Sequence, residues 1–350
     1  MDLNKQILSR RPIVIALIAI LVVLIGGGGF WVYRLAWAPN FKPDKTVYVY
    51  IDDKKDFDDL CRQLRDSANC LRIGSFKQLS GLLKYPASMR TGRYAVKPGM
   101  SNLTLLNDLR RGHQVAARVT FNNIRFKEDL AERISDQLMF GKENLLRLLN
   151  DSVYCDSLGF TPETIDALFI PNTYEIYWNI SADKFIRRMK REYDAFWTPE
   201  RLKKAEEIGL TPVEVSILAS IVEEETANNT EKPVVAGLYL NRLRIGMPLQ
   251  ADPTVKFGLQ DFGLRRILHK HLETDSPYNT YKYAGLPPGP IRIPSVVGLE
   301  SVLNYQKHDY LYMCAKEDFS GTHNFASTLS AHQANARRYQ MVLNRAGIMR

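Results

Sequence analysis

Cysteine is scarce in this chain of 350 residues, and the four that occur do not form a metal-binding pattern. Cys61, Cys70, Cys155 and Cys314 lack the paired spacing of zinc sites. The sequence also lacks phosphate-binding glycine loops, dinucleotide fingerprints and the Gly-x-Ser-x-Gly turn of many hydrolases. We therefore expect no bound metal and no cofactor. The cysteines favour isolated buried thiols, with a Cys61–Cys70 disulfide as the alternative if the protein is exported.

Long basic runs are missing as well, although the chain carries 47 Lys and Arg against 38 Asp and Glu, a formal charge of +9. Because these cations are scattered, nucleic acid is not an expected partner. A surplus of this kind suits an anionic lipid surface or an acidic polymer. With 45% hydrophobic and 24% charged residues, the composition is that of a globular protein with room for two domains beyond an anchor.

The N-terminus has the pattern of a membrane anchor. Residues 13–33 are uncharged and almost wholly apolar, which is about the length needed to cross a bilayer core. Lys5, Arg10 and Arg11 precede this span, so residues 1–12 are expected in the cytoplasm and the rest of the chain outside. The alternative is a cleaved signal peptide, since residues 36–38 (Ala-Trp-Ala) have the form of a cleavage site.

A small module is predicted beyond the span, within residues 44–112. Alternating residues at 46–51 and a β-rich stretch at 92–96 predict two strands. Apolar stripes at helical spacing predict helices at residues 57–64 and 76–83 between them, with another at 103–109. The module therefore has the order strand, helix, helix, strand.

Residues 113–350 are predicted to form a larger, mostly helical α+β domain. It begins with a strand at residues 114–121. An extended or loop segment is expected at residues 169–178, loops after residue 244, a strand at residues 310–315, and helices at residues 130–138, 144–149, 182–207, 233–244 and 328–343. The fold class is α+β with a single N-terminal transmembrane helix.

The most informative stretch is an apolar helix that ends in three acids. Thr211 is predicted as its N-cap, Pro212 as its first residue and Glu214 as the partner in a capping box. Residues 213–222 are nearly all apolar, so the helix is expected to be buried. Glu223 leaves this core near the negative end of the helix, where burial and the helix dipole favour the neutral acid that general acid catalysis needs. The alternative is a solvated helix end.

Other polar and aromatic residues have the character of a sugar-binding surface, because sugar rings stack on apolar faces and amides and hydroxyls pair with sugar hydroxyls. The candidates for substrate binding are Asn241, Arg242, Gln250, Asp252, Thr254, Tyr278, Asn279, Tyr281, His323 and Asn324. Simpler interpretations are a turn at residues 279–280 and a structural role for His323.

Several blocks together resemble the endolytic murein transglycosylase family, the MltG or YceG-like proteins. They are Leu-Ala-Ser-Ile-Val-Glu-Glu-Glu-Thr at residues 218–226, the block from Leu-Asn-Arg-Leu to Pro-Thr-Val at 240–255, Tyr-Asn-Thr-Tyr at 278–281, Gly-Leu-Pro-Pro-Gly-Pro-Ile at 285–291 and His-Asn-Phe at 323–325. Residues 170–174 look like the family's Pro-Asp-Thr-Tyr element, with Asn172 in place of Asp. The resemblance covers about residues 40–345.

The resemblance implies a LysM-like fold for the small module and a catalytic role for Glu223, with Glu225 as possible support. It implies a membrane-anchored enzyme that cuts peptidoglycan strands internally, between N-acetylmuramic acid and N-acetylglucosamine, and leaves 1,6-anhydro ends. Glu223 would act first as the acid and then as the base. The catalytic part would lie on the periplasmic face of the cytoplasmic (inner) membrane, with glycan strands and cell-wall synthesis machinery as partners.

Two other functions remain open from the sequence. One is a muramidase that uses Glu223 and Asp252 as a pair of carboxylates, because hydrolysis needs a second group to activate water. The other is a non-catalytic anchor that binds the cell wall through the small module.

Overall fold

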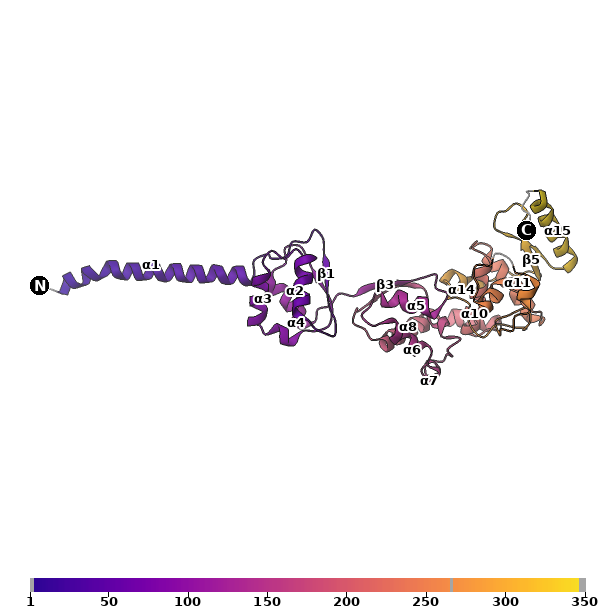
Figure 1. The fold of residues 1–350 in the computed structure, drawn as a ribbon, viewed down its shortest axis with the longest axis horizontal. Coiled ribbons are helices and arrows are strands. Elements are labelled where there is room, and N and C mark those ends of the chain that lie inside the picture. The colour runs from indigo at the N-terminus through magenta and orange to yellow at the C-terminus, as the bar shows by residue number, and fades with distance from the viewer. Residues whose placement is uncertain (1–2, 265–266, 346–350) are drawn as a thin grey trace. The chain divides into compact units, whose positions relative to one another are not determined.

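A computed structural model describes residues 3–264 and 267–345, with side chains from Ile15 onward (Figure 1). The chain divides into two compact units. The N-terminal unit comprises Met1–Arg118 and Glu175–Asn179, and the C-terminal unit comprises Val119–Tyr174 and Ile180–Arg350.

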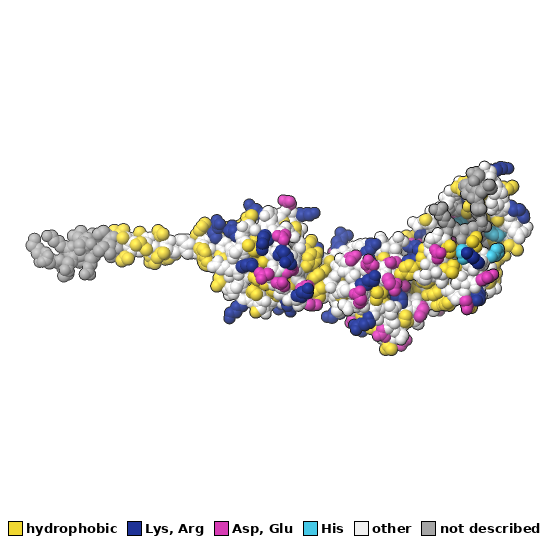
Figure 2. Space-filling model, viewed as in Figure 1, with side chains coloured by type: hydrophobic (Ala, Val, Ile, Leu, Met, Phe, Trp, Pro, Cys, Tyr) yellow, Lys and Arg dark blue, Asp and Glu magenta, His cyan; other side chains and the backbone are white. Residues whose placement is uncertain are grey.

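Helix α1 (Leu3–Ala36) contains the apolar span. Its stretch Ile15–Ala36 has a mean hydropathy of 2.5, and within the described residues it is the one helix long and apolar enough to cross a membrane. Hydrophobic side chains line the coloured part of α1 in Figure 2. The last turn differs, because Leu35 and Ala36 are buried in the core of the N-terminal unit.

The rest of the N-terminal unit has the predicted order of strand, helix, helix, strand. Strands β1 (Val47–Ile51) and β2 (Gly92–Val96) pair antiparallel, with Val47 opposite Val96. Between them lie α2 (Phe57–Asp66), α3 (Ile73–Leu82) and a short 3₁₀ helix, η1 (Tyr85–Ser88); α4 (Asn102–Arg111) follows. The side chains of Asp56 and Ser101 cap α2 and α4 through backbone N–H groups.

Strands β3 (Ala117–Phe121) and β4 (Asn172–Ile176) form a second two-stranded sheet. The intervening elements are α5 (Lys127–Ser135), α6 (Lys142–Leu149), α7 (Ser152–Asp156) and the 3₁₀ helix η2 (Ile165–Leu168). The segment expected to be extended or loop-like therefore supplies β4.

The single helix predicted over residues 182–207 is wrong. The structure has two helices there, α8 (Ala182–Phe196) and α9 (Pro199–Glu207). The break has a clear cause, since Thr198 caps α9 with its hydroxyl and Pro199 occupies the first turn. Proline lacks the N–H that a continuous helix would need at that point.

Helix α10 (Pro212–Glu225) forms the centre of the C-terminal unit, and every residue from Val215 to Val222 is buried. The predicted capping box is confirmed, because the Thr211 N–H donates to Glu214 at 2.7 Å while the Glu214 N–H donates to the Thr211 hydroxyl at 3.3 Å. Helices α11 (Lys232–Arg244), α12 (Asp252–Leu259) and α14 (Val296–Leu303) contact α10.

The expectation of loops after residue 244 is only partly correct, because α12, α13 (His269–Leu272) and α14 lie there. These helices have at most eight residues, too few to show a clear periodic stripe among the flanking Gly and Pro. Strand β5 (Tyr312–Ala315) was expected, but its hairpin partner β6 (His323–Ala326) was not; α15 (Leu329–Arg345) follows. All four cysteines are free thiols, so the alternative Cys61–Cys70 disulfide is not formed.

Candidate active site

The three acids at the end of α10 point in three directions. Consecutive residues of an α-helix are rotated by about 100°, so adjacent side chains cannot share one face. Glu223, Glu224 and Glu225 consequently make three separate sets of contacts. This separation allows each carboxylate to be assigned a different function.

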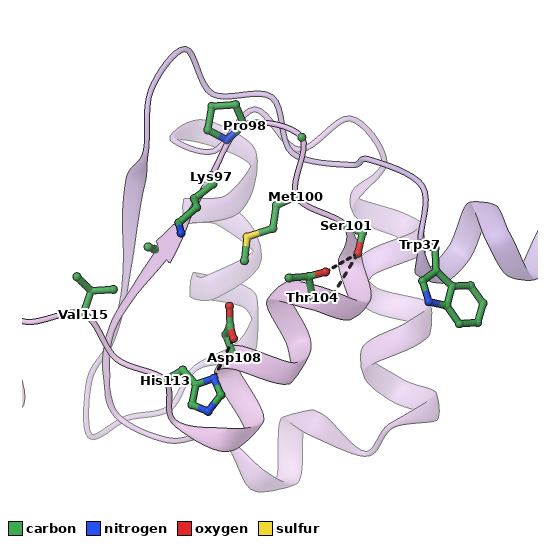
Figure 3. Close-up of a pocket in the computed structure, with 11 residues that line it drawn as sticks. Trp37, Lys97, Pro98, Met100, Ser101, Thr104, Asp108, His113 and Val115 are labelled. Carbon is green, nitrogen blue, oxygen red and sulfur yellow. Dashed lines mark hydrogen bonds and ion pairs between the residues drawn. The ribbon is translucent and has the colours of Figure 1, made fainter.

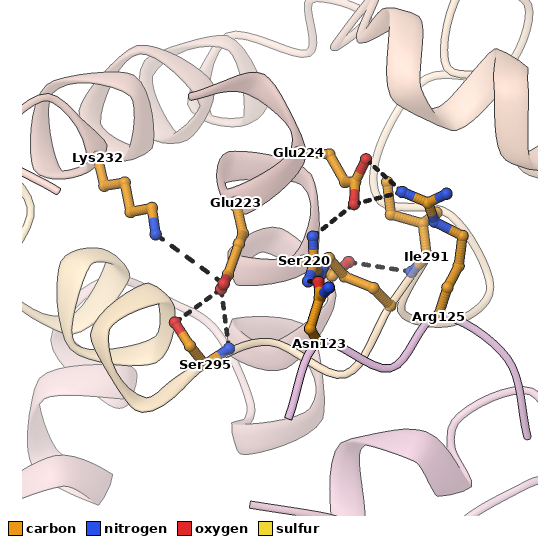
Figure 4. Close-up of polar contacts among 9 residues, drawn as sticks. Asn123, Arg125, Ser220, Glu223, Glu224, Lys232, Ile291 and Ser295 are labelled. Atoms are coloured by element: carbon orange, nitrogen blue, oxygen red, sulfur yellow. Dashed lines mark hydrogen bonds and ion pairs between the residues drawn. The ribbon is translucent and has the colours of Figure 1, made fainter. Parts of the chain in front are cut away.

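Glu223 connects α10 to the start of α14 (Figure 4). Its Oε2 accepts hydrogen bonds from the Ser295 N–H at 2.8 Å and from the Ser295 hydroxyl at 2.9 Å. Lys232 Nζ lies 4.0 Å from Oε1. A Cβ at Gly298 would lie only 2.6 Å from Glu223 Oε2, so the carboxylate approaches closely because residue 298 is glycine. This acid is thus engaged by the protein itself.

Glu224 is paired with two arginines. Arg125 Nη2 lies 2.8 Å from each of its oxygens (Figure 4). Arg292 Nη1 lies 2.6 Å from Oε1. The two arginines come from loops nearly 170 residues apart in the sequence. Glu224 therefore holds these two loops against the end of α10.

Glu225 faces a small cavity of about 200 Å³, here called the Glu225 pocket. Its Oε1 accepts a 2.7 Å hydrogen bond from the Tyr239 hydroxyl of α11, while Oε2 has no hydrogen-bond partner within the described part of the chain. The pocket is lined by Glu225, Leu238, Tyr239, Arg242, Gln250, Asp252, Tyr281, Met313, Cys314, Ala315 and His323. One oxygen of this acid is therefore available to a bound molecule.

The environment of Glu225 favours its neutral form. Burial raises the pKa of Glu225 to about 7, and the neighbouring Asp252 carboxylate adds to this effect, whereas the Tyr239 hydrogen bond and the Arg242 charge oppose it. A carboxylic acid with such a pKa is partly protonated at neutral pH. It can donate a proton and accept one again, as general acid–base catalysis requires.

A second carboxylate reaches the same pocket from α12. Asp252 stands in the first turn of that helix, and its Oδ1 accepts a 2.6 Å hydrogen bond from the Tyr281 hydroxyl. Gln250, two residues before Asp252, has a left-handed backbone with φ of 49°. Its side chain is exposed at the rim of the Glu225 pocket. Asp252 and Tyr281 form a hydroxyl–carboxylate pair in the pocket that Glu225 lines.

His323 enters the pocket from β6 and is held by a buried carboxylate. Glu231 accepts hydrogen bonds from the His323 N–H at 2.7 Å and forms a 3.0 Å contact with the ring Nδ1. Glu231 is 7% exposed, and the Thr226 hydroxyl also donates to it at 2.8 Å. With Nδ1 fixed in this way, Nε2 is the ring nitrogen left for a ligand.

The structure thus brings together Glu225, Arg242, Gln250, Asp252, Tyr281 and His323 from the predicted set. Arg242 lines the pocket but uses its guanidinium on backbone carbonyls, at 2.6 Å from both Leu249 O and Leu311 O. Sequence reasoning missed Tyr239, Glu231 and the β5 residues. Glu231 gave no signal because its partner lies 92 residues further along the chain.

The other predicted residues do not line the pocket. Thr254 and Asn279 are fully buried and bond to the Ala251 and Leu272 carbonyls at 2.7 and 2.8 Å. Asn241 donates to the His308 carbonyl at 2.7 Å. Two more predicted residues make contacts within the protein, since the Asn324 amide donates to Glu317 at 2.6 Å and the Tyr278 ring packs 4.7 Å from that of Phe257. Residue 279 also begins the turn that was the simpler interpretation.

The raised pKa of Glu225 predicts a specific pH dependence of stability. The unfolded chain loses this proton near pH 4.5, the ordinary value, while the folded chain keeps it until about pH 7. The contribution of Glu225 to the free energy of unfolding is therefore complete below pH 4.5, and it is lost as the pH rises through 7. We expect Glu225→Gln to reduce the fall in unfolding free energy between pH 5 and pH 8 by about 2–3 kcal/mol.

Guanidinium unfolding of the full chain in detergent, followed by circular dichroism at both pH values, measures this difference. Glu143→Gln serves as the control, because Glu143 is an exposed glutamate. Equal pH dependence in wild type and Glu225→Gln would contradict the assignment of a raised pKa to Glu225.

Comparisons with known proteins place the chain among named relatives. The chain is 28% identical over 336 residues to the endolytic murein transglycosylase of Bacillus subtilis (strain 168), covering 90% of this chain and 91% of that protein. It is 24% identical to the protein of the same name from Streptococcus pneumoniae serotype 2 (strain D39 / NCTC 7466), over 91% of this chain and 64% of the relative's length.

A solved structure extends the likeness to three dimensions. The 2.6 Å crystal structure of a protein described as yceG-like, from Listeria monocytogenes, superposes with a TM-score of 0.55 at 26% sequence identity. The match covers 83% of this chain and 99% of the Listeria chain. The profile of the YceG-like family matches residues 49–338. The chain therefore belongs to the YceG-like family.

Proposed function

We propose that the protein is a membrane-anchored endolytic transglycosylase of peptidoglycan and that Glu225 carries the reaction. The relatives named endolytic murein transglycosylase support the activity. The single observation that carries the assignment to Glu225 is its position: a half-buried acid with a pKa of about 7 and one unpaired oxygen in a polar pocket. This combination is what a general acid at neutral pH requires.

The reaction needs one carboxyl group used twice. Neutral Glu225 gives its proton to the glycosidic oxygen between N-acetylmuramic acid and N-acetylglucosamine as the C1–O bond breaks. The resulting carboxylate takes the proton of the muramyl C6 hydroxyl, whose oxygen bonds to C1 and closes the 1,6-anhydro ring. The acid returns to its starting state and no water is consumed. Tyr239 holds Oε1, which leaves Oε2 for both transfers.

This proposal exchanges the two roles that the sequence suggested. Glu223 was expected to be the acid and Glu225 its support. We propose instead that Glu223 positions α14, because Ser295 occupies its Oε2 through two hydrogen bonds and it does not line the pocket. Glu225 lines the pocket and combines a raised pKa with an oxygen, Oε2, that has no hydrogen-bond partner within the described residues.

Asp252 supports the second candidate, a paired-carboxylate muramidase. It lines the same pocket as Glu225 and could hold a water for hydrolysis. Its hydrogen bond from Tyr281 favours a different role, binding a sugar hydroxyl as part of a fixed pair. The two reactions differ by one water in the mass of their products.

His323 is proposed to bind the substrate through Nε2, with Glu231 as the residue that positions it. The buried Glu231 carboxylate fixes both the backbone and the ring of residue 323. This arrangement keeps the imidazole in one orientation toward the pocket, as carboxylate–histidine pairs do in other sites.

The remaining expectations concern the architecture and the location. We propose that residues 1–12 are cytoplasmic, that residues 13–33 cross the inner membrane, and that the body is periplasmic. The module at residues 44–112 is proposed to be LysM-like, followed by a catalytic domain at 113–350. The element order and the apolar helix support these assignments. Glycan strands are the proposed substrate, and cell-wall synthesis machinery is a proposed partner.

We expect Glu225→Gln to lower the rate of glycan cleavage by about 10²- to 10⁴-fold, because the amide cannot transfer the proton. Glu223→Gln should retain at least a tenth of the wild-type rate, since it keeps a group that accepts from Ser295. Both variants are compared on purified sacculi, with the soluble fragments resolved by liquid chromatography and mass spectrometry. The opposite ranking of the two variants would return the catalytic role to Glu223.

The same spectra identify the reaction. Anhydro ends from wild type, with Asp252→Asn slower but unchanged in product type, agree with the single-acid mechanism. Reducing ends that disappear in Asp252→Asn would establish the paired-carboxylate muramidase instead. Intact sacculi with the wild-type protein would favour a cell-wall-binding anchor.

The role of His323 predicts chemical rescue. His323→Gly should lower kcat about 10- to 100-fold by losing a positioned contact, and added imidazole should restore part of it. Glu231→Gln should lower kcat, with partial recovery in Glu231→Asp, while Thr322→Ala in the same hairpin should match wild type. If imidazole restores nothing while the variant remains folded, a binding role for the ring is wrong.

The anchor proposal predicts that the mature protein keeps its first residues. It should remain in the membrane fraction after a high-salt wash, since an apolar span of this length inserts in the bilayer. Intact-mass measurement and N-terminal sequencing check this directly. A mature chain that begins near Pro39 would show that a signal peptide is cleaved at residues 36–38.

A further inference from the structure

The N-terminal unit carries a charge imbalance that the proposed reaction does not use. Residues 37–118 contain 15 Lys and Arg against eight Asp and no Glu. Seven of those Asp lie before residue 67, so residues 84–118 have seven Lys and Arg and one carboxylate, Asp108. Asp108 is itself paired with His113 at 3.0 Å, in the hollow beside Trp37 that Figure 3 shows. This half of the unit is strongly basic.

Three of its cations surround one polar hollow of about 450 Å³, here called the arginine site. It is lined by Ser88, Arg90, Asn107, Arg110 and Arg111. Ser88 ends η1, Arg90 lies in the loop before β2, and the other three residues belong to the last turns of α4. No carboxylate lines this hollow. Within the described part of the chain, none of the three guanidinium groups has an ion-pair or hydrogen-bond partner.

Helix electrostatics explain only part of this cluster. Arg110 and Arg111 lie in the last turn of α4, where the negative end of the helix dipole stabilises a cation. Arg90 comes from a separate loop and lies across the same helix end. Its Cδ would be 3.3 Å from a Cβ at Gly112, the left-handed residue with φ of 75° that ends α4. Three like charges converge on one hollow without a counter-ion, which an anionic ligand would correct.

We propose that the arginine site binds carboxylates of the peptidoglycan strand, namely those of its lactyl and peptide groups, away from the bond that is cut. This inference rests on the proposed function for the identity of the polymer. Guanidinium groups bind carboxylates through paired N–H donors, and the Asn107 amide offers further N–H donors, whereas the Ser88 hydroxyl already donates to the Tyr85 carbonyl at 3.2 Å. The site lengthens the time for which the enzyme stays bound to the peptidoglycan, and it takes no part in the reaction.

The position of the site in the fold favours this polymer over lipid headgroups. The first residue of α4, Asn102, donates a 2.9 Å hydrogen bond to the Leu35 carbonyl at the end of α1. The arginines lie at the other end of α4, which in Figure 3 runs from Ser101, on the side of α1, away from α1 toward Asp108, and ten helical residues span about 15 Å. That length exceeds the roughly 5–8 Å of a headgroup layer on one side of a bilayer.

The test measures binding without cleavage. Full-length Glu225→Gln protein in phosphatidylcholine discs is sedimented with purified sacculi over a range of salt concentrations. Adding Arg90→Gln, Arg110→Gln and Arg111→Gln should weaken binding about tenfold and flatten its salt dependence, because three exposed ionic contacts are lost. The matched control is Lys45→Gln, Lys54→Gln and Lys55→Gln, which removes the same charge from exposed positions of the same unit and should change binding less than about twofold.

Two further arms identify the ligand. Sacculi whose carboxylates have been converted to amides should bind the wild-type arginine site no better than the triple arginine variant does. Phosphatidylglycerol vesicles should show no arginine-dependent binding. Equal binding by both triple variants, undiminished binding to amidated sacculi, or arginine-dependent capture by the vesicles would each overturn the proposal.

Failure of this proposal can be distinguished from failure of the proposed function. Cleavage of sacculi is measured separately with Glu225 intact, and its absence would refute the enzyme without altering the binding comparison. Conversely, an unchanged affinity of the triple arginine variant would leave the cleavage result as it stands.

Discussion

The burial of α10 from Val215 to Val222 is the constraint on which the site depends. A helix surrounded on all sides fixes the direction of each residue that emerges from its end, because neither rotation nor translation is free in a close-packed interior. Val215 to Val222 provide this fixed axis, and the two serines within it satisfy their hydroxyls on the helix's own carbonyls at 3.1 and 2.7 Å. The side chains of Glu223, Glu224 and Glu225, which follow this segment, therefore point in defined directions.

Because their directions differ, the three consecutive carboxylates lie in three different environments. Ser295 and Lys232 surround the first, two arginines neutralise the second, and only the third meets a buried tyrosine hydroxyl and open space. The distribution has a structural logic. The contacts of Glu223 and Glu224 hold α14 and two distant loops in place, and this framework forms the surroundings in which Glu225 stays partly protonated at neutral pH.

Much of the fold could be predicted from local sequence pattern, whereas the separate roles of the three acids in the site could not. The capping box of Thr211, the burial of α10 and the strands at 47–51 and 92–96 follow from propensity and periodicity, which are properties of neighbouring residues. The choice between Glu223 and Glu225 depends on Ser295, Tyr239 and Asp252, which lie up to 72 residues away. Asn241 and Thr254 were predicted to bind substrate because their side chains are polar. The sequence could not show that these side chains form their hydrogen bonds within the protein.

The junction between α1 and the N-terminal unit has a mechanical consequence. Leu35 and Ala36 are core residues of that unit, and Asn102 binds the last turn of α1, so no flexible linker separates the apolar helix from the folded body. If α1 spans a bilayer, the unit must lean whenever the helix leans. Helix tilt responds to the thickness of the hydrocarbon layer. Membrane thickness would then set the angle at which this unit meets the cell wall. Lipid composition, which determines that thickness, would therefore influence which part of the cell wall the unit contacts.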